Sequence, residues 1–101
     1  MADFELRLHP AALAEAERAR DWYRERSPVA ALGFLGELDR AIERIAESPH
    51  SWPSYVKGTR RYLLARFPLS IVYRTRDRVI EVFAIAHHRR RPGYWSDRRR
   101  V

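Results

Sequence analysis

Cysteine is absent from this chain of 101 residues. Without thiols the protein forms neither a disulfide framework nor a thiolate metal site, so a reducing compartment is the expected environment. The first eight residues alternate charged and apolar side chains and lack the uninterrupted apolar segment of a signal peptide. No stretch approaches the roughly 20 apolar residues of a membrane-spanning helix. The sequence therefore predicts a cytoplasmic protein that does not span a membrane.

Lysine is also scarce, and acidic residues are scarce in the second half. Residues 1–56 hold seven Arg and ten Asp or Glu, a net charge of −3, whereas residues 57–101 hold twelve Arg, one Lys and three Asp or Glu, a net charge of +10. A one-sided field of this kind indicates a partner that is acidic or rich in phosphate. The alternative is a surface that only keeps the protein in solution, although solubility does not require segregated charges.

The length fits one domain, residues 1–101, and the hydrophobic periodicity predicts an α+β fold. Residues 4–8 alternate like a half-buried strand. Pro10 and the Ser27-Pro28 pair are start signals for two amphipathic helices. We expect these helices to end at about Arg26 and Glu47 and to form a helical hairpin. In the second helix Glu37 is expected on a polar face.

After a predicted loop at residues 48–58, three strand-like runs follow at residues 60–67, 69–74 and 79–86. The expected order is β-α-α-β-β-β plus a C-terminal tail, with the hairpin packed on a mainly antiparallel, four-stranded sheet. The last run is apolar on both faces, so this strand should be central. Strict alternation places Ile80, Val82, Ala84 and Ala86 on one face, and Phe83, Ile85 and His87 on the other.

Basic residues gather around the second predicted strand. Alternation places Arg60 and Arg66 on one face and Arg61 on the other, so at least one of them must act from the rim. Arginine binds phosphate through paired N–H groups, and we expect Lys57, Arg60 and Arg66 to bind RNA. For Arg66 the alternative is an ion pair with a helix carboxylate across the sheet edge.

A second cluster, HHRRR at residues 87–91 followed by Tyr94 and Trp95, lies at the end of the central strand. RNA scission without a metal needs a base, cations for the phosphate and an acid. His87 can supply the base, Arg61 and Arg90 the cations, and Tyr94 the acid. Alternatively, His87 is a hydrogen-bonded core histidine.

Further RNA contacts are expected from three residues near this cluster, through charge or base stacking: Arg89, Arg91 and Trp95. For Trp95 the alternative is a role in pinning the tail to the fold, and we favour that role. No His, Asp or Glu spacing matches a metal site, so neither a metal nor another cofactor is expected.

The sequence RFPLSIVYR at residues 66–74, the sequence AHHRRRPGYW at residues 86–95 and the element order resemble the RelE/ParE toxin superfamily, over nearly the whole chain. The resemblance implies a toxin of a type II toxin-antitoxin system, of the kind linked to plasmid stabilisation. It also implies a hetero-oligomer with a small, acidic, DNA-binding antitoxin whose extended segment wraps the hairpin and the sheet.

RelE-like members are ribosome-dependent mRNA endonucleases, and Lys57, Arg61, His87 and Tyr94 match the residue types that they use. ParE-like members poison DNA gyrase and need no nuclease site. The single Lys departs from the RelE-like pattern, which relies on several. The resemblance favours mRNA cleavage, with gyrase inhibition as the first alternative and a non-toxic partner protein of the same fold as the second.

Overall fold

The computed structural model describes residues 4–100. In chain order the elements are β1 (Glu5–Leu8), α1 (Pro10–Arg26), α2 (Pro28–Glu47), β2 (Ser54–Tyr55), the 3₁₀ turn η1 (Val56–Gly58), β3 (Thr59–Leu63), β4 (Leu69–Arg76), β5 (Val79–His87) and the 3₁₀ turn η2 (Ser96–Arg100). The strands form one sheet in the order β1-β5-β4-β3-β2. β1 is parallel to β5, and the other pairs are antiparallel.

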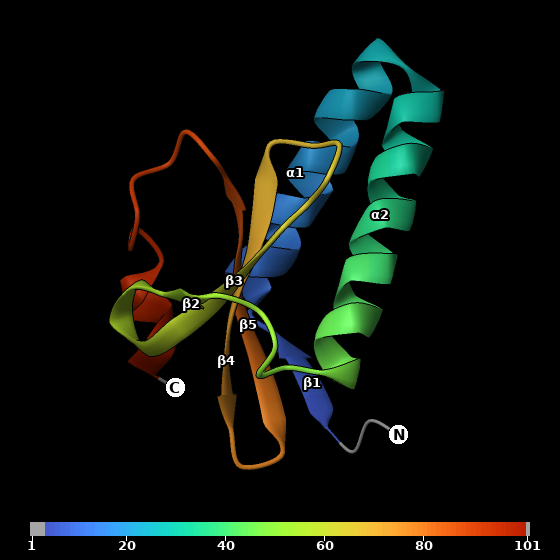
Figure 1. Ribbon diagram of the computed structural model, residues 1–101. Helices are drawn as coiled ribbons and strands as arrows, with labels where there is room; N and C mark the ends of the chain where they lie inside the picture. The colour runs from blue at the N-terminus through green and yellow to red at the C-terminus, as the bar shows by residue number, and fades with distance from the viewer. Residues whose placement is uncertain (1–3, 101) are drawn as a thin grey trace.

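The two helices lie on one side of this sheet and the C-terminal segment lies on the other (Figure 1). We call these sides the helix face and the tail face. The predicted α+β architecture is confirmed, and β5 lies inside the sheet as expected. Among residues 4–100 no helix combines the length and the apolar character needed to cross a membrane.

Local capping explains why both helices begin and end where the sequence predicts. The His9 Nδ1 atom accepts a hydrogen bond from the Ala11 N–H at 3.0 Å, and Pro10 follows at the first helical position. Ser27 is both the C-cap of α1 and the N-cap of α2. Its N–H donates to the Tyr23 carbonyl at 2.8 Å, while its hydroxyl accepts from the Ala30 N–H at 3.2 Å.

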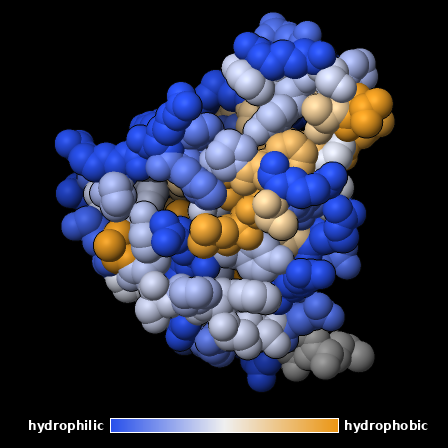
Figure 2. Space-filling view, turned by 45° about the horizontal axis from the view of Figure 1, so that its top comes forward, coloured by the Kyte–Doolittle hydropathy of each residue, from blue (hydrophilic) through white to orange (hydrophobic). Residues whose placement is uncertain are grey.

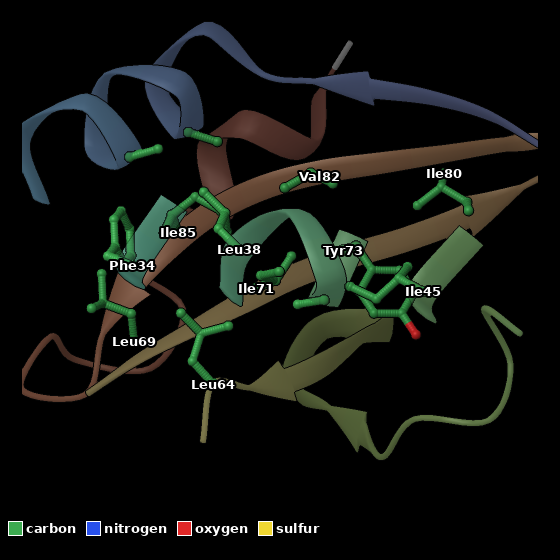
Figure 3. Close-up of a cluster of buried hydrophobic side chains, with 13 residues drawn as sticks. Phe34, Leu38, Ile45, Leu64, Leu69, Ile71, Tyr73, Ile80, Val82 and Ile85 are labelled. Atoms are coloured by element: carbon green, nitrogen blue, oxygen red, sulfur yellow. The ribbon is translucent and has the colours of Figure 1, made fainter. Parts of the chain in front are cut away.

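The main core fills the space between the helices and the helix face of the sheet (Figure 3). Phe34, Leu38 and Ile45 of α2 project from one side of it, and Ile71 and Ile80 project from the sheet. A smaller cluster on the tail face contains four buried residues: Val72, Phe83, Ala84 and Trp95. The sheet is thus covered on both sides.

A β-bulge changes the predicted faces of β5. Tyr73 pairs with Val82, but Val72 pairs with Ala84, so Phe83 is an extra residue. Ile85 therefore packs in the helix-face core, while Phe83 and Ala84 both lie on the tail face. The expected alternation was wrong beyond Val82, because it assumed a regular strand.

Two other details of the sheet differ from the prediction. The two-residue strand β2, inside the predicted loop, adds a fifth strand beside β3. In addition β3 ends at Leu63, so Arg66 lies in the connection to β4. Glu37 explains this ending, because its carboxylate accepts hydrogen bonds from the N–H groups of Ala65 and Arg66. Glu37 is buried, with 9 % of its surface exposed, and not on a polar face.

Candidate functional site

Two hollows flank the end of β5. The larger, of about 400 Å³, lies on the helix face and is lined by Arg18, Trp22 and Tyr23 of α1 together with the end of β5. The smaller, of about 190 Å³, lies on the tail face beside β3 and includes Arg61 and Arg91. Three residues border both hollows: His87, Arg90 and Tyr94.

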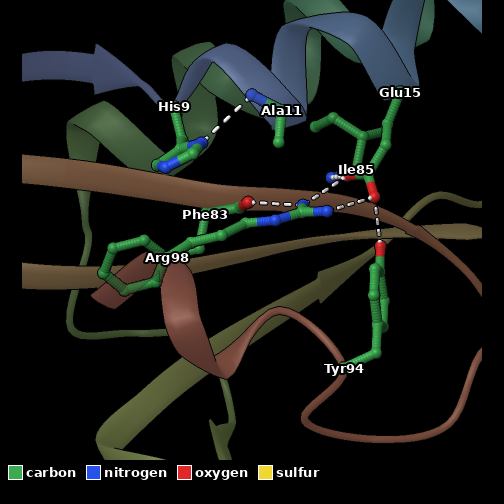
Figure 4. Close-up of polar contacts among 7 residues, drawn as sticks. All are labelled: His9, Ala11, Glu15, Phe83, Ile85, Tyr94 and Arg98. Atoms are coloured by element: carbon green, nitrogen blue, oxygen red, sulfur yellow. Dashed lines mark hydrogen bonds and ion pairs between the residues drawn. The ribbon is translucent and has the colours of Figure 1, made fainter. Parts of the chain in front are cut away.

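A buried carboxylate of α1 organises the tail (Figure 4). Glu15 is 7 % exposed, and its Oε2 atom accepts from the Tyr94 hydroxyl at 2.7 Å. Both carboxylate oxygens accept from Arg98, at 3.0 and 3.1 Å, and Oε1 also accepts from the Ile85 N–H at 3.0 Å. Neither Glu15 nor Arg98 was expected from the sequence to have a role in the site. A signal was available for Glu15, which falls inside the apolar stripe that includes Ala12 and Ala16.

Burial and this contact together set the protonation state of Tyr94. Burial, and then the hydrogen bond and charge of Glu15, raise the pKa of the Tyr94 hydroxyl. A phenol in this environment keeps its proton at neutral pH and donates it to Glu15. In this arrangement the hydroxyl is occupied by an internal hydrogen bond to Glu15.

His87 lies on the helix face, because it pairs directly with Leu69, a residue of the helix-face core. Its Nδ1 atom accepts from the Arg89 N–H at 3.1 Å. Burial, followed by the charges of Arg89 and His88, lowers the pKa of His87. The imidazole is therefore neutral near pH 7.

His88, to which the sequence analysis gave no role of its own, lies on the tail face. Its Nε2 atom is 2.8 Å from the hydroxyl oxygen of the buried Ser70, and its N–H donates to the Pro68 carbonyl at 2.9 Å. His88 thus borders the same hollow as Arg61 and Arg91.

Several of the predicted cations have partners within the protein. The Arg66 Nε atom is 3.0 Å from Glu37 Oε1, the ion pair that was the alternative to RNA binding. Burial alone would raise the pKa of Glu37, but the hydrogen bonds from Arg66 and Ala65 outweigh it and lower that pKa. The Arg60 guanidinium donates to the Trp52 carbonyl at 2.6 Å. Arg60 pairs with Tyr73, so its side chain points to the helix face, whereas the side chain of the neighbouring Arg61 points to the tail face.

The remaining cations are not neutralised. Arg61 stacks over the Tyr55 ring at 4.3 Å and Arg90 over the Tyr94 ring at 3.8 Å. Within residues 4–100 no ion pair to a carboxylate is formed by any of five cations, of which the four arginines line the hollows: Lys57, Arg61, Arg89, Arg90 and Arg91. We call this set the basic surface. It is available for a polyanionic or acidic partner.

The other stacking candidate is buried. Trp95 is 1 % exposed and stacks on Phe83 with the ring centroids 6.3 Å apart and the planes at 10°. This position pins the tail to the sheet, the role that the sequence analysis favoured. Over the described part of the chain, no cluster of three or more His, Asp or Glu residues is suited to a metal ion.

The four residues proposed for catalysis all border the smaller hollow, but their reactive groups do not meet there. Arg61 and Arg90 border it with guanidinium groups that stack on aromatic rings and pair with no carboxylate among the described residues. The His87 ring lies on the helix face, and the Tyr94 hydroxyl is bound to Glu15. The arrangement can hold an anion on the tail face, yet it separates the predicted acid and base from the tail-face cation Arg61.

Comparisons with known proteins agree with this fold. The sequence model of the family described as "ParE toxin of type II toxin-antitoxin system, parDE" matches residues 6–92. A solved structure described as "Chromosomal ParDE TA system from P. aeruginosa" superposes with a TM-score of 0.74 at 22 % sequence identity, covering 84 % of this chain and 96 % of that chain. The search of curated proteins finds no match.

These matches define a toxin domain of the RelE/ParE superfamily, as the sequence motifs indicated. Within this class, the chain belongs to the family of ParE toxins of type II toxin-antitoxin systems. An antitoxin is the partner that such a system supplies.

Proposed function

We propose that this ParE-family toxin inhibits DNA gyrase by binding, through the basic surface, to gyrase in complex with DNA. It does so without nuclease chemistry and in the cytoplasm, where its target works. One observation carries the proposal: the hydroxyl of Tyr94 donates to Glu15 at 2.7 Å and is not available as an acid. The resemblance to ParE-like gyrase poisons supports the choice of target.

The electrostatics favour a binding role. An acid that assists scission must release its proton as the leaving oxygen departs, whereas burial and Glu15 raise the pKa of Tyr94. Cations that bind a polyanion need no such chemistry. They need only be exposed and unpaired, which describes Arg89, Arg90 and Arg91.

The larger hollow is the site we assign to the antitoxin. Trp22, which lines it, is 51 % exposed. On the surface in Figure 2, hydrophobic side chains gather in patches between hydrophilic ones. An extended segment with apolar and acidic side chains would cover Trp22 and pair with Arg18 and Arg89. The segment that binds here is therefore expected to carry acidic side chains, and the family resemblance implies a small antitoxin with a DNA-binding part.

The test compares two targets in parallel. The purified chain is added to gyrase with plasmid DNA, and separately to a translating extract with one defined mRNA. We expect loss of supercoiling, accumulation of cleaved gyrase–DNA complexes and intact mRNA. Codon-phased mRNA cuts with normal gyrase activity would overturn the proposal. Normal gyrase, intact mRNA and normal growth would identify a non-toxic partner protein.

A second candidate, ribosome-dependent mRNA cleavage, rests on a specific grouping on the tail face. His88 lies 2.8 Å from the Ser70 hydroxyl and borders the same hollow as Arg61 and Arg91. An imidazole beside free guanidinium groups could accept a 2′-hydroxyl proton while the phosphate is bound. If this candidate is right, His88→Ala abolishes the mRNA cuts, whereas His87→Ala leaves them.

A further inference from the structure

We propose that Glu15 is a positioning residue: by binding Tyr94 and Arg98 it fixes the arginine loop, residues 89–91, in the orientation that the target requires. The inference rests on the proposed function, because the arginine loop is the centre of the basic surface. Glu15 itself contacts no target, since it is buried beneath the tail.

The Glu15 carboxylate joins three separate segments (Figure 4). It projects from α1, accepts from the Ile85 N–H of β5, and accepts from Tyr94 and Arg98 of the tail. Each oxygen receives two hydrogen bonds, so the four acceptor positions of the carboxylate are filled. A group this fully satisfied and this buried is expected to order the segments that it joins.

The arginine loop is fixed at both of its ends. Its start follows β5, where the His88 N–H donates to the Pro68 carbonyl. Its end leads to Tyr94, which Glu15 holds, and the Arg90 guanidinium lies 3.8 Å from the centre of the Tyr94 ring. Glu15 therefore acts on Arg90 through Tyr94. A loop ordered before binding loses less conformational entropy when the target binds.

Arg98 adds a second connection. Besides its bidentate pair with Glu15, its Nη1 atom donates to the Phe83 carbonyl at 3.0 Å, at the β-bulge. Phe83 in turn stacks on Trp95. The bulge, the tail and α1 thus meet at one carboxylate, which explains why a negative charge is buried there.

Charge alone and positioning predict opposite effects of Glu15→Gln. The substitution raises the net charge of +7 by one unit, so a purely electrostatic account predicts tighter binding to a polyanion. Positioning predicts weaker binding, because the amide cannot accept the bidentate pair from Arg98. The sign of the change therefore separates the two accounts.

Glu37→Gln is the matched control. Glu37 is also a buried helix glutamate that accepts backbone N–H groups and an arginine, and it has the same charge. It orders residues 65–66 in the connection from β3 to β4, whereas Glu15 binds Tyr94 and Arg98 of the tail. If removing any buried glutamate weakened inhibition, both variants would be weaker. If the effect comes from positioning of the arginine loop, only Glu15→Gln is weaker.

The experiment measures inhibition of gyrase by the full chain, its affinity for a short duplex DNA at several salt concentrations, and hydrogen exchange of residues 85–95. For Glu15→Gln we expect about tenfold weaker inhibition and DNA binding and faster exchange. Glu37→Gln should match the wild type. In an Arg90→Ala background, Glu15→Gln should cause a smaller loss than in the wild-type chain, because part of its effect acts through Arg90.

Tighter or unchanged DNA binding and inhibition by Glu15→Gln would overturn the inference. The inference would also be overturned if Glu15→Gln weakened inhibition by the same factor in the Arg90→Ala background as in the wild-type chain. If Glu15→Gln does not fold, Tyr94→Phe removes only the hydroxyl that Glu15 binds, and the same two criteria apply to it. If the wild-type chain leaves gyrase unaffected, the proposed function is refuted. Hydrogen exchange of the arginine loop still tests the positioning role of Glu15 in that case, because it measures loop order without gyrase.

Discussion

His87 and His88 are neighbours in sequence, but they leave the end of β5 toward opposite faces of the sheet. His87 pairs with Leu69 of the helix-face core, and His88 lies 2.8 Å from the Ser70 hydroxyl on the tail face. A single reaction centre can therefore use one of these imidazoles with Arg61, and the better placed one is His88. The nuclease hypothesis therefore predicts that His88→Ala abolishes mRNA cleavage and that His87→Ala does not, whereas the binding hypothesis gives neither imidazole a chemical role.

Tyr94→Phe should weaken growth inhibition without abolishing it, because the hydroxyl helps to position the arginine loop through Glu15 but has no assigned chemistry. The variant loses the hydrogen bond to the Glu15 carboxylate, which should lower the free energy of unfolding by about 1–3 kcal/mol. Growth after induction and chemical denaturation measure the two effects. Complete loss of toxicity in a variant that remains folded would favour the nuclease account.

Phe34→Ala should severely destabilise the domain. Phe34 has 0 % exposure and packs against Tyr23 and Phe67. Removing its ring is expected to cost about 3–5 kcal/mol, a large part of the stability of a small domain. Val29→Ala in the same helix is the control, because Val29 is 78 % exposed and should change stability by less than about 0.5 kcal/mol. Equal melting temperatures for the two variants would contradict the described core.

Mild acid should destabilise the protein in part through His87. Burial, then Arg89 and His88, lower the pKa of His87 from 6.5, so the unfolded chain binds a proton at a higher pH than the folded chain. The free energy of unfolding therefore falls as the pH drops below 6.5 toward the folded-state pKa. Glu37, whose pKa is lowered from 4.5, adds a further loss at more acid pH.

The measurement is chemical denaturation at about pH 7.5 and about pH 5.5. His87→Gln has no imidazole to protonate, so it should lose less stability between the two conditions than the wild type. The acid loss due to Glu37 is common to both proteins and cancels in the comparison. An identical pH dependence would show that His87 titrates normally in the folded protein.

Removing a cation of the basic surface should change the salt dependence of DNA binding. If Arg61 or Arg91 contacts a phosphate, Arg61→Ala or Arg91→Ala reduces the slope of log K against log salt by about 0.9. Arg66→Ala is the control, because its guanidinium already pairs with Glu37. Fluorescence anisotropy with a labelled duplex measures the slopes. Three equal slopes would argue against a specific role of the basic surface.

The helices could be predicted from the sequence because their ends depend on local chemistry. Pro10 and the Ser27-Pro28 pair act within one turn of the chain, and the observed bounds agree with them. The faces of β5 could not be predicted beyond Val82, since the bulge at Phe83 arises from pairing with β4. Strand β2 has two residues, which is too short for any periodic pattern.

The candidate site was predicted only in part, for a similar reason. The sequence located the cationic region, because the charge change after residue 57 is visible in composition. Which cations remain free depends on tertiary contacts: Arg66 and Arg98 meet carboxylates of α2 and α1, whereas Arg61 and Arg91 do not. Glu15 is the detectable clue, because it falls inside the apolar stripe of its helix, whereas the periodicity placed Glu37 on a polar face.

Inhibition of gyrase supercoiling by charge variants tests the central claim most directly. The triple variant Arg89→Ala, Arg90→Ala, Arg91→Ala removes the arginine loop. Its control removes the same charge from three exposed arginines on the helices, outside the residues that line the two hollows: Arg24, Arg26 and Arg40. We predict that the arginine-loop variant loses inhibition while the control retains it. Equal inhibition by both variants would contradict a function based on the basic surface.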